Sequence, residues 1–188
     1  YNYKSNNIIS LYFEEEKQFD NKYILIVGLS IIDLTVGKSI VHEIYSKLED
    51  DRYALDECIK FINNFNPSEL IINYKNLKTV RIDELILYLE ISNNNVIAKE
   101  ITNNNFSNIT FQNEYFTQIY KLESYLSAIE ELELEKITYA RLSFILLLYY
   151  CETHNKYLVT NLALPEFYDK TNYLHLGNNA SLQLNVFS

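Results

Sequence analysis

The chain has 188 residues, of which 48% are hydrophobic and 22% are charged, enough for one sizeable domain, or one domain and part of a second. Its 25 acidic residues outnumber its 16 basic residues, giving a net charge of −9, and no basic cluster offsets this balance. Because nucleic-acid affinity depends largely on Lys and Arg at phosphates, the composition argues against nucleic-acid binding by this chain alone.

From this sequence, we expect neither a secretory signal nor a membrane span. Its longest apolar run, residues 142–151, is much shorter than the roughly 20 residues that cross a bilayer. Cys58 and Cys151 lie in apolar helical patterns without CxxC spacing, as buried thiols of a reducing compartment would. We therefore expect an intracellular protein. Since the chain starts at Tyr1 and contains no methionine, we also expect it to be an excised part of a larger protein.

The first elements predicted are strands. Residues 8–13 form a short apolar run, residues 23–34 a longer one, and residues 39–45 alternate, so the last two segments predict a hairpin that turns at residues 35–38.

The hairpin ends in Gly37-Lys38-Ser39, like a phosphate-binding loop. Such a loop needs four residues between its first glycine and the Gly-Lys pair, and it opens a helix. Here eight residues separate Gly28 from Gly37, and a strand pattern follows. We therefore expect Gly37 to supply the hairpin turn, and we predict no nucleotide site.

From residue 51 the apolar period becomes helical, which predicts a helix capped by Asp50 or Asp51. Asn66-Pro67 ends this helix, and residues 69–73 then predict a buried strand.

Later residues predict a shorter helix over 81–91, a strand over 95–101 and helices over 113–129 and 137–153. The last helix is apolar on nearly all sides and should be central. The acidic runs in the chain, at residues 14–16, 49–51 and 130–135, are expected to be solvated faces. The predicted fold class is α/β, with a mixed sheet and flanking helices followed by a helical region.

Asp33 is the main candidate for chemistry, because metal-dependent nucleases with an RNase H-like fold keep a carboxylate near the end of a first long strand. Glu43 on the pairing strand, with Asp56 or Glu57 on the helix, would have to converge on it for two-metal catalysis. Alternatively, Asp33 begins the turn by accepting hydrogen bonds from the backbone N–H of Thr35 or Val36, an interpretation that we favour because Asp is common in turns.

The three histidines, His42, His154 and His175, are dispersed without metal-ligand spacing. We accordingly predict no catalytic, metal-binding or nucleotide-binding residue in this chain.

The order of these segments resembles the connector domain of MutS-family DNA mismatch repair proteins. Residues 8–14, 24–37 and 65–72 match its first half, and residues 139–143, 164–165, 173–180 and 182–185 resemble the start of the core domain that carries the lever helices. The residues that carry the motifs are Gly28, Asp33, Gly37, Pro67, Gly177, Asn178 and Asn179. The Gly-Asn-Asn-Ala form at residues 177–180 resembles a branch found in giant viruses and octocoral mitochondria.

The resemblance implies an RNase H-like connector domain over residues 1–130 without a working nuclease site, and the α-helical beginning of the core domain over residues 131–188. It implies a non-catalytic link between mismatch recognition and the ATPase region. The alternative hypothesis is an RNase H-like metal-dependent nuclease that uses Asp33 and Glu43, and a third hypothesis is a protein-docking module. Cofactors are expected only in the parent, a DNA-dependent ATPase that uses ATP and Mg.

The expected partners are the remaining MutS domains, with mismatched duplex DNA and a second copy for the parent protein. In bacterial relatives the connector also helps to dock a MutL-type protein. Here the corresponding helix spans residues 112–121 and presents Glu114, Gln118 and Lys121 outward. The expected location is a host cytoplasm or viral factory for a viral protein, or a mitochondrion for an octocoral protein.

Overall fold

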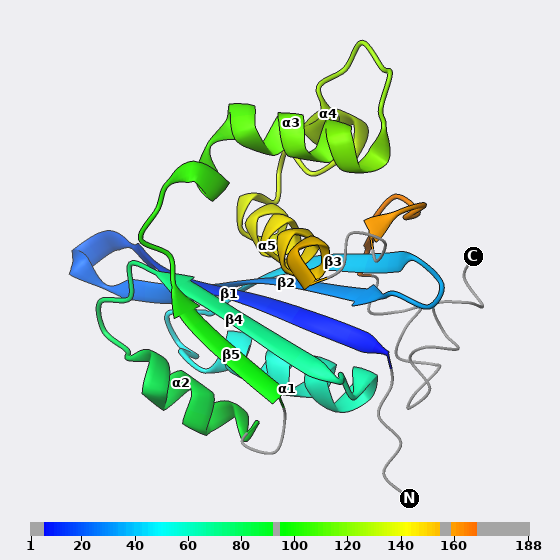
Figure 1. Ribbon diagram of the computed structural model, residues 1–188. Helices are drawn as coiled ribbons and strands as arrows, with labels where there is room; N and C mark the ends of the chain where they lie inside the picture. The colour runs from blue at the N-terminus through cyan, green and yellow to red at the C-terminus, as the bar shows by residue number, and fades with distance from the viewer. Residues whose placement is uncertain (1–5, 92–94, 155–158, 169–188) are drawn as a thin grey trace, which may run out of the picture.

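A six-stranded mixed sheet with the strand order β5-β4-β1-β2-β3-β6 forms the centre of the protein (Figure 1). The computed structural model describes residues 6–91, 95–154 and 159–168. The strands are β1 (Asn7–Lys17), β2 (Tyr23–Asp33), β3 (Lys38–Tyr45), β4 (Glu69–Lys75), β5 (Asn95–Glu100) and β6 (Glu166–Phe167). β1, β2 and β3 are antiparallel neighbours, whereas β4 pairs parallel to β1, β5 parallel to β4, and β6 parallel to β3.

Helices cover both faces of this sheet (Figure 1). The helices are α1 (Tyr53–Phe65), α2 (Ile82–Leu89), α3 (Ile109–Tyr120), α4 (Ala128–Glu131) and α5 (Thr138–His154), with 3₁₀ turns η1 (Phe19–Asn21) and η2 (Asn105–Ser107). The α/β fold class predicted from the sequence is therefore confirmed, with flanking helices around a mixed sheet.

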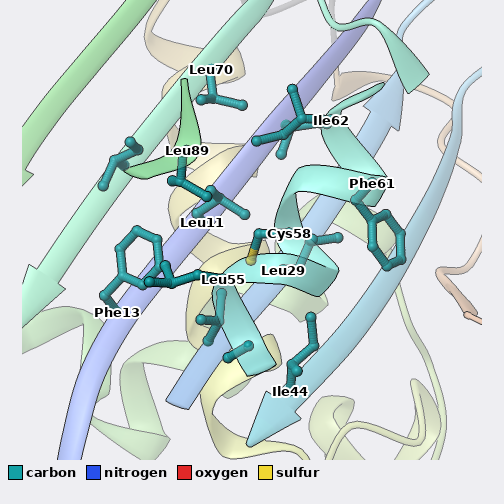
Figure 2. Close-up of a cluster of buried hydrophobic side chains, with 14 of the residues drawn as sticks. Leu11, Phe13, Leu29, Ile44, Leu55, Cys58, Phe61, Ile62, Leu70 and Leu89 are labelled. Carbon is teal, nitrogen blue, oxygen red and sulfur yellow. The ribbon is translucent and has the colours of Figure 1, made fainter. Parts of the chain in front are cut away.

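One hydrophobic core lies between the sheet and helices α1 and α2. Strand residues alternate between the two faces, so the odd-numbered apolar residues of β1 and β2, such as Leu11 and Leu29, point to this side. Figure 2 shows them meeting Leu55 and Cys58 of α1. Cys58 is fully buried, as its apolar helical pattern predicts.

The second core lies on the opposite face, where α5 packs against the middle of the sheet and α3 and α4 cover α5 from outside (Figure 1). Phe144, Leu147, Leu148 and Cys151 of α5 are fully buried there. A helix enclosed on both sides needs apolar residues around its whole circumference, which is why the sequence of α5 lacks a polar face. The predicted central position of this helix is confirmed.

The hairpin prediction at residues 23–45 is confirmed. β2 and β3 pair antiparallel from Ile26↔Tyr45 to Asp33↔Lys38, and Gly37 at the turn has a φ of 69°, a backbone conformation that favours glycine. The Asp33 carboxylate accepts a hydrogen bond from the Thr35 backbone N–H at 2.9 Å, as the turn interpretation predicts.

The connection from α1 to β4 also follows the prediction. Asn66 ends α1 with a φ of 40°, and its backbone N–H donates to the Ile62 carbonyl. Pro67 is buried, and the Ser68 backbone N–H donates to the Asn7 carbonyl at the start of β1.

Two helix predictions were wrong in detail. The helix expected over residues 113–129 is two helices, because α3 ends at Tyr120, Lys121 turns into the left-handed region and α4 begins after Ser127. The expected cap of α1 is displaced: Arg52 occupies the N-cap position, and the Asp50 carboxylate accepts the Arg52 backbone N–H at 3.2 Å.

The expectation that residues 14–16 form a solvated face was wrong for Glu15, which is only 6% exposed. Its carboxylate accepts hydrogen bonds from the backbone N–H groups of Lys78, Thr79 and Val80 and from the Thr79 hydroxyl. Together these hydrogen bonds replace the hydration that the Glu15 carboxylate loses on burial. They also attach the loop before α2 to β1.

His175, Gly177, Asn178, Asn179 and the alternating tail at residues 182–186 lie outside the described residues.

Candidate functional site: the seat of helix α5

Helix α5 touches the backbone of β2 directly at Gly28. A Cβ atom placed on Gly28 would lie 2.0 Å from the Tyr139 carbonyl oxygen and 2.8 Å from the Ala140 nitrogen, much closer than any real contact. Only glycine therefore allows the first turn of α5 to approach the sheet this closely. Together with Ser10, Ser30, Glu43, Tyr139 and Ser143, Gly28 forms what we call the α5 seat.

A serine network fixes α5 to the sheet at Ser143. The Ser143 hydroxyl donates to the Ser10 carbonyl at 2.9 Å, while the Ser10 hydroxyl donates to the Ser143 carbonyl at 3.0 Å. The hydroxyls of Ser30 and Ser143 also lie 3.0 Å apart. All three side chains are completely buried, so these bonds have no competition from water and hold the helix to both β1 and β2.

The N-terminus of α5 is capped by a residue far away in the chain. The Glu43 carboxylate on β3 accepts the backbone N–H groups of Tyr139 at 2.7 Å and Ala140 at 3.1 Å. These amides have no partner within the helix, and a negative charge at a helix N-terminus is favourable. Glu43 therefore sets both the position and the direction of the helix start.

Tyrosine hydroxyls surround this capped end. Tyr45 donates to Glu43 at 2.6 Å, Tyr12 donates to Glu14 at 2.6 Å, and Tyr139 donates to Glu16 at 3.2 Å. Burial, followed by these carboxylates, raises the pKa of Tyr12 and Tyr45 well above the usual value, so both stay protonated as donors.

Arg141 connects the seat to the outer helices. Its Nε donates to the Gln112 side chain of α3 at 2.8 Å, and a terminal nitrogen donates to the Leu134 carbonyl at 2.9 Å. The residue is 4% exposed, and burial lowers the pKa of its guanidinium from the usual value. α3, the α4–α5 connection and α5 are thus joined through one side chain.

The candidate metal ligands do not converge. In the β2–β3 pairing Asp33 lies opposite Lys38, whereas Glu43 lies opposite Gly28, five positions along the strand and about 17 Å away. Strand alternation also directs Asp33 to the α1 face, while Glu43 caps α5 on the other face. Of the helix candidates, Asp56 accepts the Tyr88 hydroxyl and Glu57 pairs with Lys60.

The described ranges contain no group of three or more His, Cys, Asp or Glu side chains able to hold a metal ion. Lys38 and Ser39 are the first residues of β3 rather than the opening of a helix, so they lack the geometry of a phosphate-binding loop.

Similarity to known proteins was found for nearly the whole chain. A mutS homolog of Acanthamoeba polyphaga mimivirus, which carries the description of a DNA mismatch repair protein, is 37% identical over 204 aligned positions. The alignment covers 97% of this chain and 18% of the relative. The chain belongs to the MutS family. No protein-family model matches it.

This MutS-family chain thus spans about a fifth of the length of the mimivirus relative. Among the helices in the described parts of the chain, none combines the length and apolar character required to cross a bilayer.

Of the residues expected to dock a partner in this MutS-family chain, Glu114 and Gln118 are exposed on α3 and Lys121 is exposed at its C-cap. Gln118 and Lys121 line a pocket of about 390 Å³ between the end of α3, Glu152 of α5 and residues 159–162. Their docking role stays a prediction.

Sequence reasoning identified Gly28 and Asp33 as motif residues, but it missed the serines and the capping role of Glu43. One signal was available: Gly28 and Ser30 occupy alternate positions in an otherwise apolar strand, which marks a strip of small residues on one face.

Proposed function

We propose that this chain is the connector of a MutS-type mismatch repair protein, a non-catalytic element that links mismatch recognition to the ATPase region. The observation that carries the proposal is the α5 seat, in which a helix contacts sheet backbone at Gly28 and is held by buried hydrogen bonds on both β1 and β2. Such a junction deforms little, so a force applied to α5 moves the sheet with it.

The sheet supports the connector proposal. An antiparallel β1–β2–β3 meander followed by the parallel strands β4 and β5 is compatible with the RNase H-like fold that the resemblance implies. We propose that the connector extends through α5 instead of ending at residue 130, because α5 supplies the second core of the sheet.

The motif at residues 139–143 fits this role residue by residue. Tyr139 and Ala140 present the amides that Glu43 binds, Arg141 holds α3, and Ser143 binds the two central strands. The polar residues of this stretch therefore join α5 to the sheet and to α3.

The activities of the whole protein are part of the same proposal. We propose that the parent binds mismatched duplex DNA, hydrolyses ATP with Mg, forms dimers and acts inside the cell, and that this segment itself holds no cofactor. A MutL-type partner would dock beside Glu114, Gln118 and Lys121.

A chimera tests the coupling role. The mimivirus relative would receive this chain in place of its aligned segment, and ATP hydrolysis would be measured with matched and mismatched duplexes. We expect Ser143→Ala, which removes the serine bonds without steric conflict, to reduce the stimulation by mismatched DNA while basal hydrolysis persists. Leu87→Ala, at a side chain 80% exposed on α2, is the control and should leave the stimulation unchanged.

The isolated 188-residue chain provides the second arm. We expect it neither to hydrolyse ATP nor to retain duplex DNA at physiological salt, because of its net charge of −9. Mg²⁺-dependent cleavage of a duplex that Asp33→Asn abolishes would establish the nuclease function instead. Unchanged stimulation in the Ser143→Ala chimera would contradict the coupling role.

A further inference from the structure

The chain segment after α5 is fastened to the edge of the sheet. We name residues 159–168 the strap. The Ala163 backbone N–H donates to the Gly37 carbonyl at 2.9 Å, β6 pairs with Ile40 and Val41, and the Tyr168 backbone N–H donates to the Val41 carbonyl at 3.0 Å. The strap therefore runs from the β2–β3 turn along the outer edge of β3.

The strap is anchored on both faces of the sheet. Val159 is 5% exposed and belongs to the core beneath α5. At the other end, the Tyr168 ring packs on the α1 face, with its centroid 4.5 Å from that of Phe61 and 5.0 Å from that of His42. The segment thus crosses the sheet edge from one core to the other.

The turn is shaped to admit the strap. A Cβ on Gly37 would lie 3.2 Å from the Asn161 carbonyl oxygen, and the φ of 69° already disfavours any other residue there. Gly37 therefore serves both the hairpin and the close approach of the strap.

Between its anchors the strap has only a short strand pairing with the sheet. β6 comprises only two residues, whereas β1 and β2 pair over eleven positions. Leu164 and Phe167 remain 49% and 40% exposed, so apolar burial between the anchors comes mainly from Leu162 and Pro165. Segments with few buried contacts and exposed backbone bonds open locally, well before the fold unfolds as a whole.

We propose that the strap is a releasable clasp that closes and opens the outer edge of β3. Closed, it covers the edge at Ile40 and Val41. Open, it exposes the backbone of β3 at these two residues. The inference rests on the proposed connector function, to which it adds a switch at the edge of the sheet.

Native-state hydrogen exchange of the 188-residue chain tests the clasp. The backbone amides of residues 163 and 168 should exchange about tenfold faster than those of β1 and β2. Their exchange rates should change little at low denaturant concentrations, as expected for local opening. Tyr168→Ala, which removes one anchor, should accelerate exchange in the strap a further tenfold or so while β1 and β2 keep their protection. Leu164→Ala, at an exposed position of the same segment, is the matched control and should change neither.

The chimera measures the consequence of opening. Tyr168→Ala should lower mismatch-stimulated ATP hydrolysis, and Leu164→Ala should not. If the strap amides of the unmutated chain exchange only when those of β1 and β2 exchange, the clasp does not open separately. That result would overturn the proposal, whatever the variants do. Local opening with unchanged stimulation in the Tyr168→Ala chimera would also overturn it. Either result would leave the connector function standing, because that function is tested separately through Ser143.

Discussion

The close contact at Gly28 makes Gly28→Ala an informative substitution. The added Cβ would meet the Tyr139 carbonyl oxygen at 2.0 Å, so α5 must retreat by about 1.4 Å to reach ordinary contact. Both neighbouring atoms belong to the backbone and cannot rotate away. The retreat would lengthen the Ser143 bonds, now 2.9 to 3.0 Å, beyond hydrogen-bonding range.

The expected cost follows from these losses. Overpacking a core costs about 1–3 kcal/mol, and each of the two weakened Ser143 bonds about 0.5 kcal/mol, so we expect Gly28→Ala to lower the free energy of unfolding by about 2–4 kcal/mol. With an m-value of about 2 kcal/mol/M, the urea midpoint should fall by about 1–2 M.

Far-UV circular dichroism can follow the urea titration, supported by tyrosine fluorescence since the chain has 17 Tyr and no Trp. Leu87→Ala, at a position 80% exposed, is the control and should change the free energy of unfolding by less than about 0.5 kcal/mol. A midpoint for Gly28→Ala within about 0.3 M of the unmutated chain would refute the backbone contact between α5 and β2.

Three further predictions concern Glu43, the cysteines and His42. Glu43→Ala should cost about 1–2 kcal/mol in urea unfolding, and Glu43→Gln, which keeps an acceptor for the Tyr139 and Ala140 amides, distinctly less; equal losses would show that the cap is not the cause. Burial raises the pKa of Cys151 to about 12 and that of Cys58 also, so a thiol reagent such as Ellman's reagent should modify both only as fast as the protein unfolds; rapid modification of the native chain would contradict their burial. Burial lowers the pKa of His42 from 6.5, against an opposing effect of Glu57, so the unfolded state binds the proton more readily and stability is lost as the pH falls through 6.5. His42→Gln should therefore reduce the fall in melting temperature between about pH 7.5 and about pH 5.5. An identical fall in the variant would exclude His42 as its source.

The sequence predicted those parts of the fold that depend on neighbouring residues. The hairpin at residues 23–45 could be predicted because strand alternation and the turn residues Asp33 and Gly37 act over a few positions. The central position of α5 followed from its uniformly apolar composition. The start of α4 after the break also has a local sequence signal, because Ser127 and Glu130 have capping-box spacing. In the structure the Ser127 hydroxyl accepts the Glu130 backbone N–H.

The contacts of the seat and the strap could not be predicted in this way. Glu43 was considered as a metal ligand because a carboxylate on a strand near Asp33 has that chemistry, and only the folded chain brings it to amides 96 residues later. Glu15 looked solvated inside an acidic run, although the loop at residues 78–80 covers it. β6, with two residues, is too short to leave any periodic pattern.

Most helices rest on a layer of side chains whose rotamers can adjust when the helix shifts slightly, so small displacements are dissipated. At Gly28 no such layer exists, because the peptide groups of α5 and β2 are in contact. A pull on the C-terminal end of α5 would therefore reach β2 undamped, and the stiffness of this contact comes from the absence of a side chain at Gly28.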